Sequence, residues 1–129
     1  MPHRSSVPIS WRMSKSGYSL LGSKCSCGKY FFPERPVCSC GKSTEGFLFS
    51  GSGVVVCFTV IRNAPAGFGA CAPYIVGIIK LAEGPTTTSQ VIGSPEKLRV
   101  GSRVRRVFRK IYEGGPAGLL QYTAKFEVV

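Results

Sequence analysis

Four of the chain's six cysteines form two close pairs of the kind that hold a metal ion. Cys25 and Cys27 lie in the run Cys-Ser-Cys-Gly-Lys, and the same run recurs thirteen residues later with Cys38 and Cys40. Four thiolates in two such pairs are the ligands of a closed, tetrahedral structural zinc site. A glycine follows each pair, and glycine takes the positive φ needed where a chain bends back around the sulfurs. The pattern therefore predicts structural zinc bound by all four cysteines.

The spacing inside each pair leaves alternatives open. Zinc knuckles commonly have two residues between the paired cysteines, whereas this chain has one. The shorter spacing tightens the chelate ring, so zinc, iron and a metal-free ribbon with free thiols or disulfides all remain alternatives. A ribbon this small has little core of its own, and structural zinc contributes on the order of 10–16 kcal/mol to the folding of such units.

The rest of the chain lacks the residues for autonomous catalysis. Cys57 and Cys71 lie outside the paired pattern, and we expect both to be buried as small hydrophobic side chains. A nucleophilic cysteine needs a base nearby, but the single histidine is His3. The acidic residues are all Glu, so a Ser–His–Asp triad cannot be built. The sequence predicts no catalytic residues.

Positive charge concentrates in one stretch of the chain. There are 17 Lys and Arg against 6 acidic residues, a net charge of +11. The segment from 97 to 110 holds seven cations and no acid: Lys97, Arg99, Arg103, Arg105, Arg106, Arg109 and Lys110. On a strand, Arg103, Arg105 and Arg109 share one face. Because the planar guanidinium suits phosphate, the stretch indicates a nucleic-acid backbone or the phosphates of a nucleotide-containing small molecule, with a solvated face as the third alternative.

Length and composition limit the fold. A chain of 129 residues makes one domain or two small ones, and its 43% hydrophobic content excludes a disordered polybasic tail. The 16 Gly and 9 Pro favour short strands joined by tight turns. The longest apolar stretches, 54–58 and 75–79, are far shorter than the ~18 residues that span a bilayer. With no signal-peptide pattern either, we expect a soluble, cytoplasmic protein without a membrane partner.

Strand patterns follow one another from residue 47 onward. They cover residues 54–61, 74–81, 86–92, 103–112 and 119–128. Five strands fit a small closed barrel of the OB type better than a two-sheet sandwich. We therefore expect a mainly β fold in three parts, namely an N-terminal arm (1–23) with a short helix at about 8–15, a zinc ribbon (24–46) and a C-terminal five-stranded OB-fold barrel (47–129).

The N-terminal arm has isolated apolar residues without a strong period. Trp11 and Tyr18 lie among Ser, Lys and Arg, which is typical of an arm that packs on another protein. The other alternative is an arm folded back on its own domain, with Trp11 in the core. The sequence favours neither.

The order of several motifs resembles a known family. The motifs are Trp11-Arg12, YSLLGSKCSC at 18–27, GKYFFP at 28–33 followed by Cys38, Phe58-Thr59-Val60, Pro73-Tyr74 and LAEGP at 81–85. Together they resemble the rubredoxin-like zinc-ribbon plus OB-fold family of acyl-CoA-associated proteins, and the likeness covers nearly the whole chain. The resemblance implies a rubredoxin-like zinc ribbon before the OB barrel.

The resemblance also implies a non-catalytic partner of thiolase-like enzymes. In archaea such a protein looks like the bridge between acetoacetyl-CoA thiolase and 3-hydroxy-3-methylglutaryl-CoA synthase, in the mevalonate route to isoprenoids. These two enzymes and acyl-CoA are then the expected partners. Contacts with the enzymes are expected at Trp11, Arg12 and Tyr18.

Within such an assembly, charge and loop composition favour CoA as the shared ligand. Its phosphates would meet the cationic stretch at Arg103, Arg105, Arg106 and Arg109. Its pantetheine arm would lie against the loop at 64–74, where the candidates are Phe68, Pro73 and Tyr74.

A nucleic-acid-binding ribbon and OB module is the alternative function, because both units occur in such proteins and the net charge has the right sign. OB surfaces that bind nucleic acids usually expose aromatic side chains for base stacking. Here we expect much of the aromatic content in the ribbon and the core, and therefore no nucleic-acid partner. An acyl-CoA hydrolase or transferase is the weakest interpretation, since the chain has no Asp and a single histidine.

Overall fold

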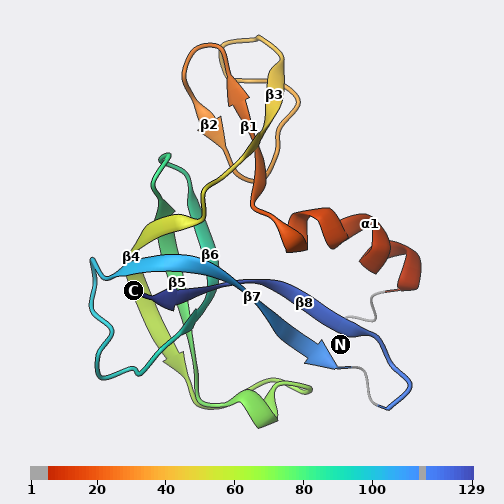
Figure 1. Cartoon of the computed structure of the whole chain (residues 1–129), viewed down its shortest axis with the longest axis vertical. Coiled ribbons are helices and arrows are strands. Elements are labelled where there is room, and N and C mark those ends of the chain that lie inside the picture. The colour runs from red at the N-terminus through yellow and green to blue at the C-terminus, as the bar shows by residue number, and fades with distance from the viewer. Residues whose placement is uncertain (1–5, 114–115) are drawn as a thin grey trace.

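The chain folds into a small sheet joined to a closed barrel, with one helix beside the barrel (Figure 1). The computed structural model describes residues 6–113 and 116–129. The helix is α1 (Val7–Tyr18), and a short 3-10 turn is η1 (Gly69–Cys71). The sheet contains β1 (Leu21–Cys25), β2 (Tyr30–Phe31) and β3 (Thr44–Leu48). The barrel contains β4 (Ser52–Ile61), β5 (Tyr74–Leu81), β6 (Thr86–Ile92), β7 (Arg103–Glu113) and β8 (Leu120–Val128).

The helix α1 is longer than the predicted helix at 8–15. Pro8 lies in its first turn, where the missing proline N–H costs no hydrogen bond. At the other end the backbone N–H and the hydroxyl of Ser19 both donate to the Lys15 carbonyl, each at 3.2 Å. The helix contacts β8, so the arm folds back on its own chain. No helix of the described residues is long and apolar enough to span a membrane.

The barrel strands close in the order β4-β5-β6-β8-β7, which confirms the prediction of a five-stranded OB-like barrel. All neighbouring strands are antiparallel except β6 and β8, which pair in parallel at Val91–Phe126 and Ile92–Glu127. Along β5 every second residue from Ile75 to Leu81 is buried, as a strand with one face on a core requires. A bulge after Val55 bends β4.

One hydrophobic core runs from the barrel into the sheet. Its barrel members are Val55, Ile75, Ile79, Leu81, Val91, Leu98, Val104 and Phe126. Leu20 and Phe49 continue it toward the ribbon, where Phe49 is 2% exposed. The Phe49 ring meets Phe47 and Phe32 edge-on, with centroids 5.2 and 5.9 Å apart, and Tyr30 packs on the same group. These aromatic contacts hold the ribbon on the barrel.

The prediction that Cys57 and Cys71 are buried is wrong. Both thiols are exposed, because Cys57 follows the bulge of β4 and Cys71 ends the 3-10 turn of the long loop. The division into parts at 23/24 and 46/47 stays a prediction. The sheet strands β1 and β3 extend across these positions, from Leu21 to Leu48.

Two glycines of the ribbon sheet give a matched test of the junction between ribbon and barrel. A Cβ at Gly22 would collide with the Phe31 carbonyl oxygen and the Phe49 ring, whereas a Cβ at Gly46 meets only Glu34, at 4.0 Å. We expect Gly22→Ala to lower the free energy of unfolding by about 1–3 kcal/mol, since a backbone oxygen and a packed ring must move. Gly46→Ala should change it by less than about 0.5 kcal/mol. Denaturant unfolding measures both, and equal effects would contradict the close packing.

Candidate metal centre and cationic surfaces

The four paired cysteines come together at one end of the ribbon sheet. Their sulfurs all lie within 4.8 Å of one another, and the Cys25–Cys40 and Cys27–Cys38 sulfur pairs are 3.5 and 3.6 Å apart. Tetrahedral zinc with bonds of ~2.3 Å needs sulfurs about 3.8 Å apart. The four thiols therefore fit a single tetrahedral ion, and the one-residue spacing does not prevent them from converging.

The repeated run folds into two equivalent turns. Cys25 N–H donates to the Lys29 carbonyl and Cys38 N–H to the Lys42 carbonyl, both at 2.9 Å. Gly28 and Gly41 have φ of 90° and 83°, values that only glycine adopts readily. This conformation explains why the same five residues occur twice.

Hydrogen bonds within the cluster set the sulfur pKa values. The Cys40 backbone N–H lowers the pKa of Cys38 to about 6, and the Cys27 backbone N–H lowers the pKa of Cys25. At Cys40 the Lys42 backbone N–H also favours the thiolate, but the neighbouring sulfurs outweigh it and raise the pKa of Cys40 to about 11. The neighbouring sulfurs thus oppose ionisation at Cys40, and a divalent cation would relieve this effect.

We expect protein purified with zinc to hold one ion per chain. Cys38→Ser removes one of four ligands and should lower zinc content and melting temperature, whereas Cys57→Ser, outside the cluster, should change neither. Acid should release the ion because protons compete for the thiolates. Elemental analysis together with thermal unfolding measures these effects. Iron in place of zinc, or equal behaviour of the two variants, would contradict a structural zinc site.

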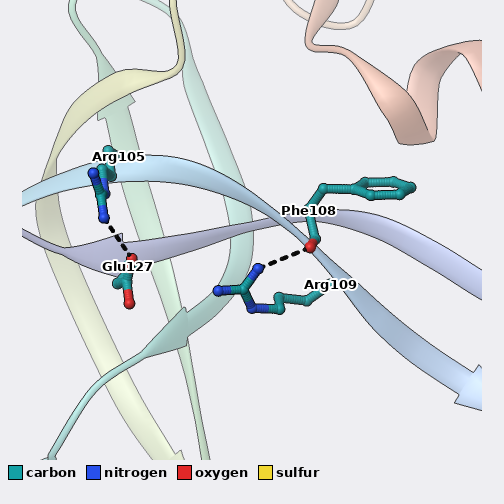
Figure 2. Close-up of polar contacts among 4 residues, drawn as sticks. All are labelled: Arg105, Phe108, Arg109 and Glu127. Carbon is teal, nitrogen blue, oxygen red and sulfur yellow. Dashed lines mark hydrogen bonds and ion pairs between the residues drawn. The ribbon is translucent and has the colours of Figure 1, made fainter.

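The four arginines predicted to bind phosphate do not form one cluster, because Arg106 lies on the other face of β7 from Arg103, Arg105 and Arg109. Arg105 forms an ion pair with Glu127 at 3.2 Å, and Arg109 donates to the Phe108 carbonyl at 3.1 Å (Figure 2). Arg106 lies on the other face of β7 and donates to the Tyr18 carbonyl at 2.8 Å. Its guanidinium caps the C-terminus of α1, where a cation is favourable. Arg106 therefore positions the helix.

A shallow groove of about 570 Å³ lies on the outer face of β4, β5 and β7. Arg103 and Lys80 stand opposite Val54 on either side, so the three side chains form a row across the sheet. Arg105 lines the same groove, and so does Val129. The sequence did not identify Lys80 as part of this surface. Lys80 lies on β5, which is near β7 only because both strands pair with β4.

The loop residues predicted to face pantetheine lie near a second cavity of about 260 Å³. Pro73 and Tyr74 line it together with Cys71 and Lys125, and the Phe68 ring packs on Tyr74 with centroids 6.3 Å apart. Burial lowers the pKa of Lys125. This cavity and the groove beside Arg103 share no lining residue.

The arm residues predicted to meet partners lie on α1. Trp11 is 81% exposed and Arg12 is also exposed. The Tyr18 ring stacks on Phe108, and Phe108 stacks on Tyr122, with centroids 5.2 and 5.4 Å apart. Much of the aromatic content lies in the ribbon and the core, as expected, and these residues are Tyr30, Phe32, Phe47, Phe49 and Phe126. The three stacked rings are exposed, which the sequence did not predict.

A four-cysteine ribbon joined to an OB barrel is the class of protein that this fold defines. Residues 48–109 match the family model described as ChsH2, C-terminal OB-fold domain. The chain is 40% identical over 122 residues to a DUF35 domain-containing scaffold protein of Pyrococcus furiosus, covering 92% of this chain and 90% of the relative. It is 39% identical over 128 residues to one of Methanocaldococcus jannaschii, covering 95% and 91%. The chain belongs to this family of DUF35 domain-containing scaffold proteins.

Solved structures show the same fold. The chain resembles one described as Ltp2-ChsH2(DUF35) aldolase, with a TM-score of 0.70 and 22% identity over 99% of this chain and 98% of the other. A DUF35 family protein of unknown function from Sulfolobus solfataricus matches with a TM-score of 0.58 and 20% identity, over 98% and 90%. At these identities the likeness concerns the fold alone.

Proposed function

We propose that the chain is a non-catalytic scaffold subunit that bridges acetoacetyl-CoA thiolase and 3-hydroxy-3-methylglutaryl-CoA synthase. The observation that carries the proposal is the identity of about 40% to archaeal proteins named as scaffolds, over nine-tenths of both chains. The finer assignment to these two enzymes rests on the motifs from Trp11 to Pro85. Exposed apolar side chains on α1 and the β7–β8 hairpin supply surface for partner contacts.

The scarcity of residues that could act as a catalytic base supports a non-catalytic role. The single histidine, His3, lies outside the described residues, and the chain contains no Asp. Cys57 and Cys71 are exposed thiols on β4 and η1, and neither has a histidine or an aspartate in the described residues to act as its base. The chain is therefore suited to position other enzymes.

Bridging has a clear physical benefit for this pair of reactions. Condensation of two acetyl-CoA molecules is unfavourable, so little acetoacetyl-CoA accumulates in free solution. Holding the two enzymes together raises the effective concentration of acetoacetyl-CoA at the next, favourable step. A bridge needs complementary surfaces and a rigid core, and the core shared by ribbon and barrel supports the second requirement.

The scaffold proposal predicts co-elution. The chain should pass through gel filtration with both enzymes of the same organism, also at high salt, because apolar contacts are not screened. With the chain present, less free acetoacetyl-CoA should appear while product forms. Turnover of a thioester by the isolated chain, or elution apart from both enzymes, would refute the proposal.

We further propose that the chain contributes to CoA binding. The groove beside Lys80, Arg103 and Arg105 is the candidate for the phosphates, while Arg106 and Arg109 bond to backbone carbonyls. Phe68, Pro73 and Tyr74 remain the proposed wall for pantetheine. Zinc is the proposed ion of the cysteine cluster, where it would hold the ribbon folded.

The CoA proposal is tested by calorimetry on the assembled complex. The double variant Lys80→Gln/Arg103→Gln removes two cations from the groove and should weaken CoA binding about tenfold, since each exposed contact with phosphate contributes up to about 1 kcal/mol. Arg62→Gln, an exposed cation at the end of β4 and outside the groove, is the matched control. Equal affinity of all three proteins would remove this groove from the CoA site.

A further inference from the structure

A groove of about 450 Å³ separates α1 from the end of the β7–β8 hairpin. Its lining is mainly apolar, and its helix wall presents residues at helical spacing. The apolar lining residues are Ile9, Met13, Tyr18, Phe108, Ile111, Leu120 and Tyr122. In Figure 1 the helix and the hairpin lie to one side of the barrel, away from the tip of the ribbon.

The two walls of this groove are held together at the C-terminal end of α1. Arg106 of β7 donates to the Tyr18 carbonyl at the C-terminus of α1, and the Tyr18 ring stacks on Phe108. The groove is thus a formed feature of the chain, because a hydrogen bond and a ring stack fix the helix relative to the hairpin. Its large side chains are nevertheless open to solvent, with Met13 63% and Leu120 54% exposed.

The hydroxyl of Ser10 adds a polar feature to the groove. Ser10 lines it, and its Oγ atom is buried without a hydrogen-bond partner among the described residues. An unpaired buried hydroxyl costs free energy until a partner group reaches it. Contiguous apolar surface that carries such a group is typical of protein interaction sites.

The elements that build the groove carry cations close to its lining residues. The helix α1 carries Arg12 and Lys15 and no acid, and β7 has Arg106 and Lys110 on the face that bears Phe108. Arg103, Arg105 and Arg109 lie on the other face of β7 and do not belong to this surface. Glu127 is paired with Arg105 on that other face. Lys110 stands opposite Tyr122 on the groove face of the hairpin. A ligand of this surface must therefore combine apolar anchors with negative flanks.

We propose that this groove docks an amphipathic helical segment of a partner enzyme, with an apolar stripe in the groove and acidic residues on both flanks. The inference rests on the proposed scaffold function and names the surface and the chemistry of one contact. The apolar stripe covers Met13 and Leu120, and the acidic flanks face Arg12 and Lys15 of α1 and Lys110 of β7. A polar group of the segment meets the Ser10 hydroxyl.

A single-stranded nucleic acid suits the groove less well. Base stacking needs free ring faces, but Phe108 already stacks with Tyr18 and with Tyr122. Much of the remaining lining is aliphatic, from Ile9, Ile111 and Leu120. These side chains complement leucine or phenylalanine better than a nucleotide.

The chemistry of the groove is tested with synthetic helices. One probe carries leucines at i, i+3, i+4 and i+7 with glutamates on the flanks, and its matched control has lysines in place of the glutamates. Fluorescence anisotropy of labelled probes should give at least tenfold tighter binding of the acidic helix. The fluorescence of Trp11, the single tryptophan of the chain, gives a second readout from α1.

Substitutions then locate the binding. Leu120→Glu places an unpaired acid in the groove and should weaken binding of the acidic helix at least tenfold, while the exposed side chain leaves folding intact. Val100→Glu, at an exposed position outside the groove, is the control. Circular dichroism and melting temperature check that both variants fold.

The same variants enter the co-elution experiment with thiolase and synthase. Loss of either enzyme by Leu120→Glu alone supports the proposal. The wild type could also elute apart from both enzymes and still bind the acidic helix in a manner sensitive to Leu120→Glu. That result would refute the scaffold function for these partners and support the proposed ligand of the groove. The proposal is overturned if Leu120→Glu affects neither the helix nor the enzymes, or if an oligothymidine binds the groove more tightly than the acidic helix.

Discussion

The aromatic packing around Phe49 is the contact on which the arrangement of the molecule depends. The ribbon has three short strands and too few apolar residues for a core of its own. Phe49 lies directly after β3 and joins the barrel core, while Tyr30, Phe32 and Phe47 pack around it. The ribbon and its cysteines are therefore held against the barrel by this aromatic packing.

The cysteine cluster and the aromatic junction lie at opposite ends of the ribbon. The sulfurs of Cys25 and Cys40 tie two turns at the end away from the barrel, and the Phe49 cluster ties the other end. Since each end has its own stabilising contact, the ribbon stays ordered with very little buried apolar area between them. A metal ion held by these four cysteines would have a structural role, in keeping with a site made of four thiolates.

The cations serve several purposes in this fold. Arg106 fixes α1, Arg105 pairs with Glu127, and Arg103 joins Lys80 on the outer face of the barrel. A stretch that is continuous in sequence is thus divided between two faces of β7, because neighbouring residues of a strand point in opposite directions. One face supports the helix groove and the other carries the proposed phosphate site.

The sequence alone determined the class of fold and the cysteine cluster. Alternating strand patterns with Gly and Pro turns predicted the barrel, and the repeated Cys-Ser-Cys-Gly-Lys run predicted the ligand set, since these are local patterns with strict spacing. The tertiary structure decided what depends on neighbours distant in sequence. It brought Lys80 beside Arg103, exposed Cys57 and Cys71, and set the helix against the hairpin. Strand order and register govern such contacts, and a single sequence does not specify either.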